Sequence, residues 1–96
     1  MSVRIGNREF EKVSYDDVVD VLYLRNEHDE KGVTTYGTSE GHAVRLDAGG
    51  NVVGMTIVNA RWLIERDGSI VISIPQQRIE APAKDLGIAL EQSVSE

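Results

Sequence analysis

Two stretches of the chain share one pattern, in which a run rich in β-branched residues stops at an Asp-and-Gly turn and then resumes as a second run. The first runs from His42 to Val58 around a turn at residues 47–51, and the second runs from Arg61 to Ile74 around Asp67-Gly68. An Asp-Gly pair between two such runs is a strong sequence signal for a β-hairpin. Consecutive hairpins predict an antiparallel meander, because a tight turn returns the chain alongside itself.

Shorter runs predict the remaining strands. Residues 3–5 and 8–13, joined by a turn at 6–7, are typical of an N-terminal hairpin with Phe10 as its large apolar anchor. Residues 14–17 are turn formers, and the run Val18–Arg25 is apolar on both faces, which predicts a central strand. Residues 33–41 are expected to hold a weak strand. Gly54 inside the run 52–58 indicates a bulge or the close approach of a neighbouring element.

The pattern changes after Pro75, which ends the last predicted strand and leaves residues 76–80 as a connector. Pro82 suits the first turn of a helix, and Ala83, Leu86 and Leu90 recur at helical spacing, so we expect a short helix that ends near Glu91. The fold prediction is one α+β domain, a mainly antiparallel β meander of about six strands with this C-terminal helix. The sheet is expected to be open or a half-barrel.

Within residues 1–96 the expected segments are an N-terminal hairpin (1–13), a core (14–60), a C-terminal hairpin with its connector (61–80) and the helix (81–92). The expected core consists of the larger apolar side chains of these elements. They are Phe10, Val19, Val21, Leu22, Tyr23, Leu24, Val44, Leu46, Val53, Met55, Ile57, Trp62, Ile64, Ile70, Ile72 and Leu86.

The charge balance narrows the classes of partner that the protein is expected to bind. Sixteen acidic and ten basic residues give a net charge of -6, which repels phosphate backbones and argues against nucleic-acid binding. An acidic surface suits a basic protein partner, although solubility alone explains it equally well. The chain has no cysteine, no signal-peptide pattern at its start and no apolar run long enough to span a bilayer. We therefore expect a cytoplasmic protein that does not bind membranes.

The densest acidic group is Asp16, Asp17 and Asp20. Carboxylates of this kind bind divalent cations, but the group lacks the further ligands and the glycine of an EF-hand loop, which favours a structural turn. Asp20 is expected to share a face with apolar residues, so its carboxylate needs a hydrogen-bond donor. The donors available are backbone N–H groups or an arginine such as Arg25 or Arg45.

The two histidines have no sequence-local second ligand at a recognised spacing. His28 lies in a charged run typical of a solvated loop, and His42 begins a strand. The Arg61-Trp62 pair is typical of an interface hot spot, and a lone Trp equally often caps a small core. No nucleophile elbow or phosphate-binding loop occurs, so we predict no catalytic residue, cofactor or metal site.

Two separated motifs resemble a known family. Residues 15–25 have a Tyr-Asp start followed by an Asp-x-Leu-Tyr-Leu-Arg strand, and residues 44–60 have an Asp-x-x-Gly turn and a Gly-x-x-Ile strand that ends in Asn-Ala. Together, over residues 13–60, they resemble a bacterial family designated domain of unknown function 2283. Thr56 stands where that family often has an acidic residue, so the resemblance implies no role for this position.

The resemblance implies a small bacterial β-rich protein without an established activity or transferable catalytic residues. Some relatives are encoded beside small toxin-like proteins, so the resemblance also suggests an antitoxin-like role.

The primary hypothesis is a non-catalytic protein–protein interaction module that forms a homodimer, because a sheet with one thin helix leaves an apolar face uncovered. The alternative is a small-ligand binder or minor enzyme that uses a carboxylate and histidine cleft. Candidate ligand or interface residues are Asp16, Asp20, Arg25, His42, Arg45 and Trp62.

Overall fold

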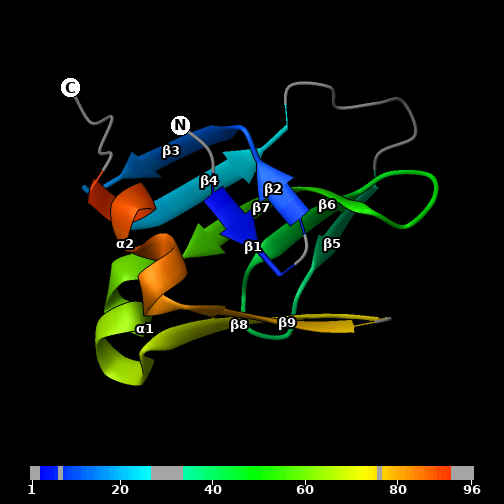
Figure 1. The fold of residues 1–96 in the computed structure, drawn as a ribbon. Helices are drawn as coiled ribbons and strands as arrows, with labels where there is room; N and C mark the ends of the chain where they lie inside the picture. Colours follow the sequence, from blue (N-terminus) through cyan, green and yellow to red (C-terminus); the bar gives the residue numbers. More distant parts are fainter. Residues whose placement is uncertain (1–2, 7, 27–33, 76, 92–96) are drawn as a thin grey trace.

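The computed structural model describes residues 3–6, 8–26, 34–75 and 77–91. The described chain forms nine strands and two helices, and all strand pairs are antiparallel (Figure 1). The strands are β1 (Val3–Ile5), β2 (Arg8–Phe10), β3 (Lys12–Asp16), β4 (Val21–Arg25), β5 (Thr34–Gly37), β6 (Ala43–Leu46), β7 (Val52–Val58), β8 (Ser69–Ile74) and β9 (Gln77–Pro82). The helices are α1 (Ala60–Asp67) and α2 (Ala83–Glu91). The α+β class and the antiparallel arrangement predicted from the sequence are confirmed.

The largest unit is a five-stranded sheet with the order β3-β4-β7-β6-β5. The two most apolar strands, β4 and β7, have a neighbour on both sides, which confirms the prediction of a central strand at β4. The predicted turn between β6 and β7 is also confirmed. Asp47 Oδ1 accepts hydrogen bonds from the backbone N–H groups of Gly49 and Asn51, both at 2.9 Å, which fixes the turn.

Gly54 of β7 has close neighbours in the sheet. A Cβ atom at Gly54 would lie 3.3 Å from the carbonyl oxygen of Leu24. The register between β6 and β7 also shifts next to this position, because Arg45 pairs with Gly54 whereas Leu46 pairs with Val52. Both expectations for this glycine, a close approach and a bulge, are confirmed.

One face of the five-stranded sheet is covered by the hairpins β1–β2 and β8–β9 and by α2 (Figure 1). The hydrophobic core lies between these layers. Its largest fully buried side chains come from both sides: Tyr15, Phe10, Ile5, Leu22, Leu24, Ile57, Ile70, Ile72, Leu86 and Val44. The N-terminal hairpin and the C-terminal helix were both predicted, and the helix ends at Glu91 as expected. The second arm of the hairpin was predicted over residues 8–13, but β2 ends at Phe10 and residues 12–13 begin β3.

The second predicted hairpin, around Asp67-Gly68, is wrong. Residues 60–67 form helix α1, and Gly68 ends it with φ 78° and donates its N–H to the carbonyl oxygen of Ile64 at 2.8 Å. An Asp-Gly pair serves a left-handed helix end as well as it serves a hairpin turn. The predicted strand 69–74 is confirmed as β8, but its partner is β9, which the sequence analysis treated as a connector. Pro82 ends β9, and the helix begins one residue later.

The turn before β4 was also misplaced. Residues 14–16 belong to β3, and the turn follows at residues 17–20, so β4 begins only at Val21. Val19 (56% exposed) and Trp62 (52%) were expected in the core and are exposed as a result of these shifts. Tyr23 (43%) was also expected there, but its side chain lies on the face of β4 opposite the buried Leu22 and Leu24. Val21, Leu46 and Ile64, which were also expected in the core, are only partly buried.

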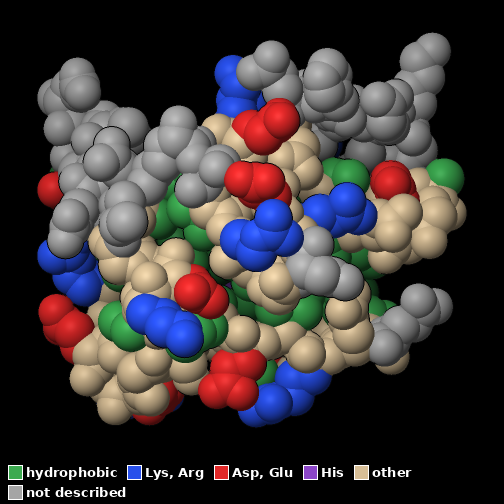
Figure 2. Space-filling model, viewed as in Figure 1, with side chains coloured by type: hydrophobic (Ala, Val, Ile, Leu, Met, Phe, Trp, Pro, Cys, Tyr) green, Lys and Arg blue, Asp and Glu red, His purple; other side chains and the backbone are tan. Residues whose placement is uncertain are grey.

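Charged side chains of both signs are interspersed over the face shown in Figure 2, and hydrophobic side chains are visible mainly in recesses between them. In the part of the chain that the structure describes, no helix has the length and apolar character required to cross a membrane.

Candidate functional site

The second face of the five-stranded sheet, which we call the outer face, points away from the core. The strand registers align its side chains in three rows that run across the strands from β3 towards β5. The middle row is Ser14, Tyr23, Thr56, Ala43 and Gly37. The basic row is Lys12, Arg25, Gly54, Arg45 and Thr35. The third row is Asp16, Val21 and Val58.

Large apolar side chains are exposed on and beside the outer face. Tyr23 in the middle row and Val58 in the third row are 43% and 37% exposed. Beyond the third row lies the β3–β4 turn, where Val18 is 80% and Val19 is 56% exposed. Adjoining exposed apolar side chains are a feature of interaction sites.

Helix α1 is held beside this end of the sheet by Asp20. Its carboxylate accepts hydrogen bonds from the backbone N–H of Arg61 at 2.8 Å and of Trp62 at 3.1 Å, and from the Tyr15 hydroxyl at 2.7 Å. Asn59, the residue at the helix start, provides no side-chain cap, so Asp20 caps the helix from a distant point in the sequence. The predicted use of backbone N–H donors is confirmed for this carboxylate.

The electrostatics of Asp20 agree with this capping role. Burial alone would raise the pKa of Asp20, but hydrogen bonds from Tyr15 and from the backbone of Arg61 and Trp62 hold it below the ordinary value. The pKa of Tyr15 is raised, first by burial and then by its bond to Asp20. The carboxylate is therefore kept ionised at the helix N-terminus, where negative charge is favourable.

The other candidate residues are spread over the sheet and its ends. Asp16 accepts a hydrogen bond from the Val18 N–H at 3.0 Å, which is a turn contact. Arg25 and Arg45 flank Gly54 on the outer face, because a Cβ there would lie 3.6 Å from Arg25 Cβ and 3.5 Å from Arg45 Cδ. His28 lies outside the described residues.

His42 is buried, with 3% of its surface exposed, and lines a hollow of about 450 Å³ beside α1 and β8. Its Nδ1 accepts the backbone N–H of Val58 at 3.1 Å, so Nε2 carries the proton of the neutral ring. Nε2 is itself buried and has no hydrogen-bond partner within the described structure. Burial lowers the pKa of His42 against the opposing attraction of Glu40, so the ring is kept neutral.

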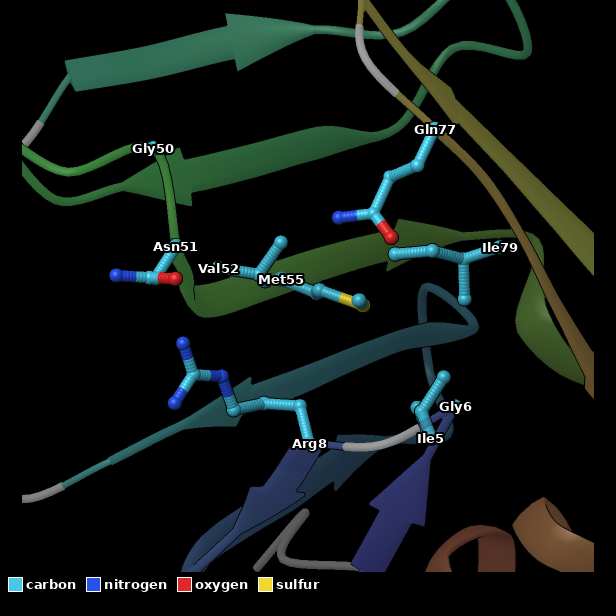
Figure 3. A pocket seen from close by; sticks show the side chains of 9 residues that line it. All are labelled: Ile5, Gly6, Arg8, Gly50, Asn51, Val52, Met55, Gln77 and Ile79. Atoms are coloured by element: carbon cyan, nitrogen blue, oxygen red, sulfur yellow. The ribbon is translucent and has the colours of Figure 1, made fainter.

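A second, polar-rimmed hollow of about 220 Å³ lies on the core side of the sheet (Figure 3). Met55 of β7 and Ile79 of β9 provide apolar walls. Arg8 of β2 and Asn51 of the β6–β7 turn point toward each other at one side, and Gln77 reaches in from β9 (Figure 3). We call this the Arg8 hollow.

The sequence analysis did not single out any of the polar residues of the Arg8 hollow. Arg8, Asn51 and Gln77 come from three different segments, and none of them belongs to a motif with a recognised spacing. The only sequence signal was indirect, since Arg8 and Asn51 each adjoin a predicted turn. Among the described residues, no group of three His, Asp or Glu side chains is placed to hold a metal ion.

These features define a small α+β protein with an exposed sheet face and a separate polar-rimmed hollow. The model of the family described as protein of unknown function (DUF2283) matches residues 12–61. The match covers more than half of the 96 residues, and the chain belongs to this family. It spans β3 to the first two residues of α1, and therefore includes Asp20 and one of the two N–H groups that Asp20 caps, that of Arg61. No curated protein and no solved structure matches the chain.

Proposed function

We propose that this protein works by protein–protein association through the outer face, and that its partner there is a second copy of the same chain. The observation that carries the proposal is the exposure of Tyr23 and Val58 on a sheet whose other face is covered by two hairpins and α2. Burial of such side chains is the main source of free energy in association, and tyrosine is enriched at the centres of interfaces.

The charges of the outer face suit self-association. A two-fold axis along the middle row turns one sheet over onto the other and exchanges the basic row with the third row. Lys12 of one copy then lies opposite Asp16 of the other, and the two Tyr23 rings meet near the axis. The face is therefore complementary to itself, whereas its basic row is poorly suited to a basic partner.

The area of the outer face sets the expected affinity of the dimer. Five strands about 4.8 Å apart and five residues with a rise of about 3.4 Å give a flat area of roughly 400 Å². Stable dimers bury about 800 Å² per partner, so the outer face alone supports a weak dimer. Contacts from the exposed β3–β4 turn add to this area. We expect a dissociation constant in the micromolar range, on the order of 10–100 µM.

Sedimentation equilibrium over a range of protein concentrations tests the proposal. We expect the full chain to change from monomer to dimer, and Tyr23→Lys to weaken the dimer by at least about tenfold, since it places two charges near the axis. Tyr23 is exposed in the monomer, so this variant should unfold at the same temperature as the unchanged protein.

A charge exchange makes the test specific for the proposed geometry. Lys12→Asp and Asp16→Lys should each weaken the dimer by placing like charges opposite each other, and the double variant should restore it. The matched control exchanges Arg4 and Glu9, an exposed pair 3.7 Å apart on the β1–β2 hairpin, and should leave the dimer unchanged.

Three results would reject this proposal. The first is a monomer at millimolar concentration. The second is a dimer that survives Tyr23→Lys while the β3 amides become protected from hydrogen exchange, which would show pairing at the sheet edge. The third is a chain that stays monomeric and whose outer face is covered only when a different protein binds, for example a toxin-like protein encoded beside it and captured by the tagged chain. That result would favour the antitoxin-like role instead.

A further inference from the structure

Arg8 brings a positive charge to the Arg8 hollow. Its side chain is half-buried and points into the space between β2 and the β6–β7 turn (Figure 3). Asp47 attracts it electrostatically, yet no hydrogen bond or ion pair joins the Arg8 side chain to another residue in the described part of the chain. A guanidinium has five N–H donors in a planar fork, which matches a carboxylate well.

Asp47 is engaged elsewhere. Its carboxylate accepts the backbone N–H groups of Gly49 and Asn51, both at 2.9 Å, and the Asn51 side-chain amide at 3.3 Å. The N–H of Asn51 lowers the pKa of Asp47, which therefore stays ionised as the anchor of its own turn. Within the part of the chain that the structure describes, the side-chain donors of Arg8 are thus left for a ligand.

Below its polar rim the hollow also has a small apolar wall. Val52 and Met55 are buried, and with Ile79 they line the space below the polar rim. Gln77 reaches over Met55 and brings a second amide to the rim (Figure 3). The volume of about 220 Å³ is roughly seven times the ~30 Å³ that one water occupies in the liquid, so a ligand of about seven heavy atoms fits.

The geometry points to a binding site for a small carboxylic acid with a short apolar tail. The carboxylate pairs with the Arg8 guanidinium and the Gln77 amide, and the tail lies against Met55 and Ile79. The site is separate from the proposed dimer interface, because Met55 points to the core side of the sheet and the outer face lies on the opposite side. The inference therefore does not depend on the proposed function.

Titration of the ¹⁵N-labelled full chain with 3-methylbutanoate, followed by amide chemical shifts, tests the inference. We expect saturable shifts at Arg8, Asn51, Val52 and Gln77, with a dissociation constant of about a millimolar for so small a ligand. The neutral 3-methylbutanamide has the same size and shape and should bind at least about tenfold more weakly. Acetate, which lacks the tail, should also bind more weakly.

Arg8→Gln should weaken 3-methylbutanoate at least about tenfold. Arg4→Gln is the matched control, since it removes the same charge from the other strand of the same hairpin, and it should leave binding unchanged. The ¹⁵N spectrum of each variant shows directly whether it is folded. Equal binding of acid and amide, loss of binding with Arg4→Gln as large as with Arg8→Gln, or shifts confined to other surfaces would each overturn the inference.

Discussion

A single carboxylate organises the junction between the sheet and α1. Asp20 has a left-handed backbone conformation with φ 59°, and from there its side chain reaches two N–H groups of α1 and the Tyr15 hydroxyl. Its own carbonyl oxygen also accepts the N–H of Ala60 at 3.1 Å. An eight-residue helix has little stability of its own, so this cap is the contact on which α1 depends most directly.

Asp20→Ala should therefore lower the free energy of unfolding by about 3 kcal/mol, because it removes the cap and strains the left-handed backbone. Asp20→Asn should lower it by only about 1 kcal/mol, since asparagine tolerates this conformation and still accepts a hydrogen bond. Urea unfolding measures both. Asp85→Ala, which removes the acidic residue in the first turn of α2, is the control and should cost about 0.5 kcal/mol. Equal losses for Asp20→Ala and Asp85→Ala would contradict the capping role.

His42 is expected to make the free energy of unfolding depend on pH near neutrality. The folded state favours the neutral ring because burial lowers the pKa of His42, and because a proton on Nδ1 would break its bond with the Val58 N–H. The unfolded chain binds this proton below about pH 6.5. The contribution of His42 to stability is thus complete above that pH and is lost as the pH falls.

We expect the free energy of unfolding to be lower at pH 5 than at pH 8, and His42→Asn to remove most of that difference. Asparagine can place an acceptor where Nδ1 lies and cannot titrate. Urea titrations at the two pH values measure the effect. His28→Asn replaces the other histidine of the chain and is the control, which should keep the pH dependence. If the His42→Asn variant also keeps the pH dependence, then the fold does not hold the His42 ring neutral.

At the scale of elements, the sequence pattern correctly predicted the features that depend only on neighbouring residues. The β6–β7 turn is fixed by Asp47 within five residues, and the alternation in β8 places Ile70 and Ile72 in the core, so both could be read from neighbouring residues. The C-terminal helix was predicted for the same reason, because Leu86 and Leu90 recur on its buried side.

Helix α1 shows where such patterns stop being informative. Its sequence contains Trp62, Leu63 and Ile64 in succession, which fits a strand as well as a helix. The contact that decides the outcome comes from Asp20, which is 41 residues away from Arg61 in the sequence. The Arg8 hollow was missed for a similar reason, since it exists only where three distant segments meet.

At the scale of the whole molecule, a second carboxylate joins the five-stranded sheet to the β8–β9 hairpin. Glu40, in the turn between β5 and β6, accepts the backbone N–H of Ser73 at 3.0 Å and the Ser73 hydroxyl at 2.6 Å. These bonds, chiefly the one from the hydroxyl, lower the pKa of Glu40 to about 2. The contact connects two sheets that share no strand pairing, so its loss should loosen the hairpin against the rest of the molecule.

The final prediction concerns the stability of the protein at acidic pH. Between pH 4.5, the ordinary pKa of this group, and pH 2 the unfolded chain binds a proton at Glu40 that the folded chain does not, so stability should fall across this range and be complete above it. Glu40→Gln and Ser73→Ala should each make the decline shallower, by a modest amount because the carboxylate is exposed to solvent. Ser69→Ala, a change of the other serine in β8, should keep the wild-type slope arising from Glu40. Urea unfolding at half-unit pH steps resolves the three profiles. A wild-type slope in both Glu40→Gln and Ser73→Ala would mean that this contact does not hold the two sheets together in solution.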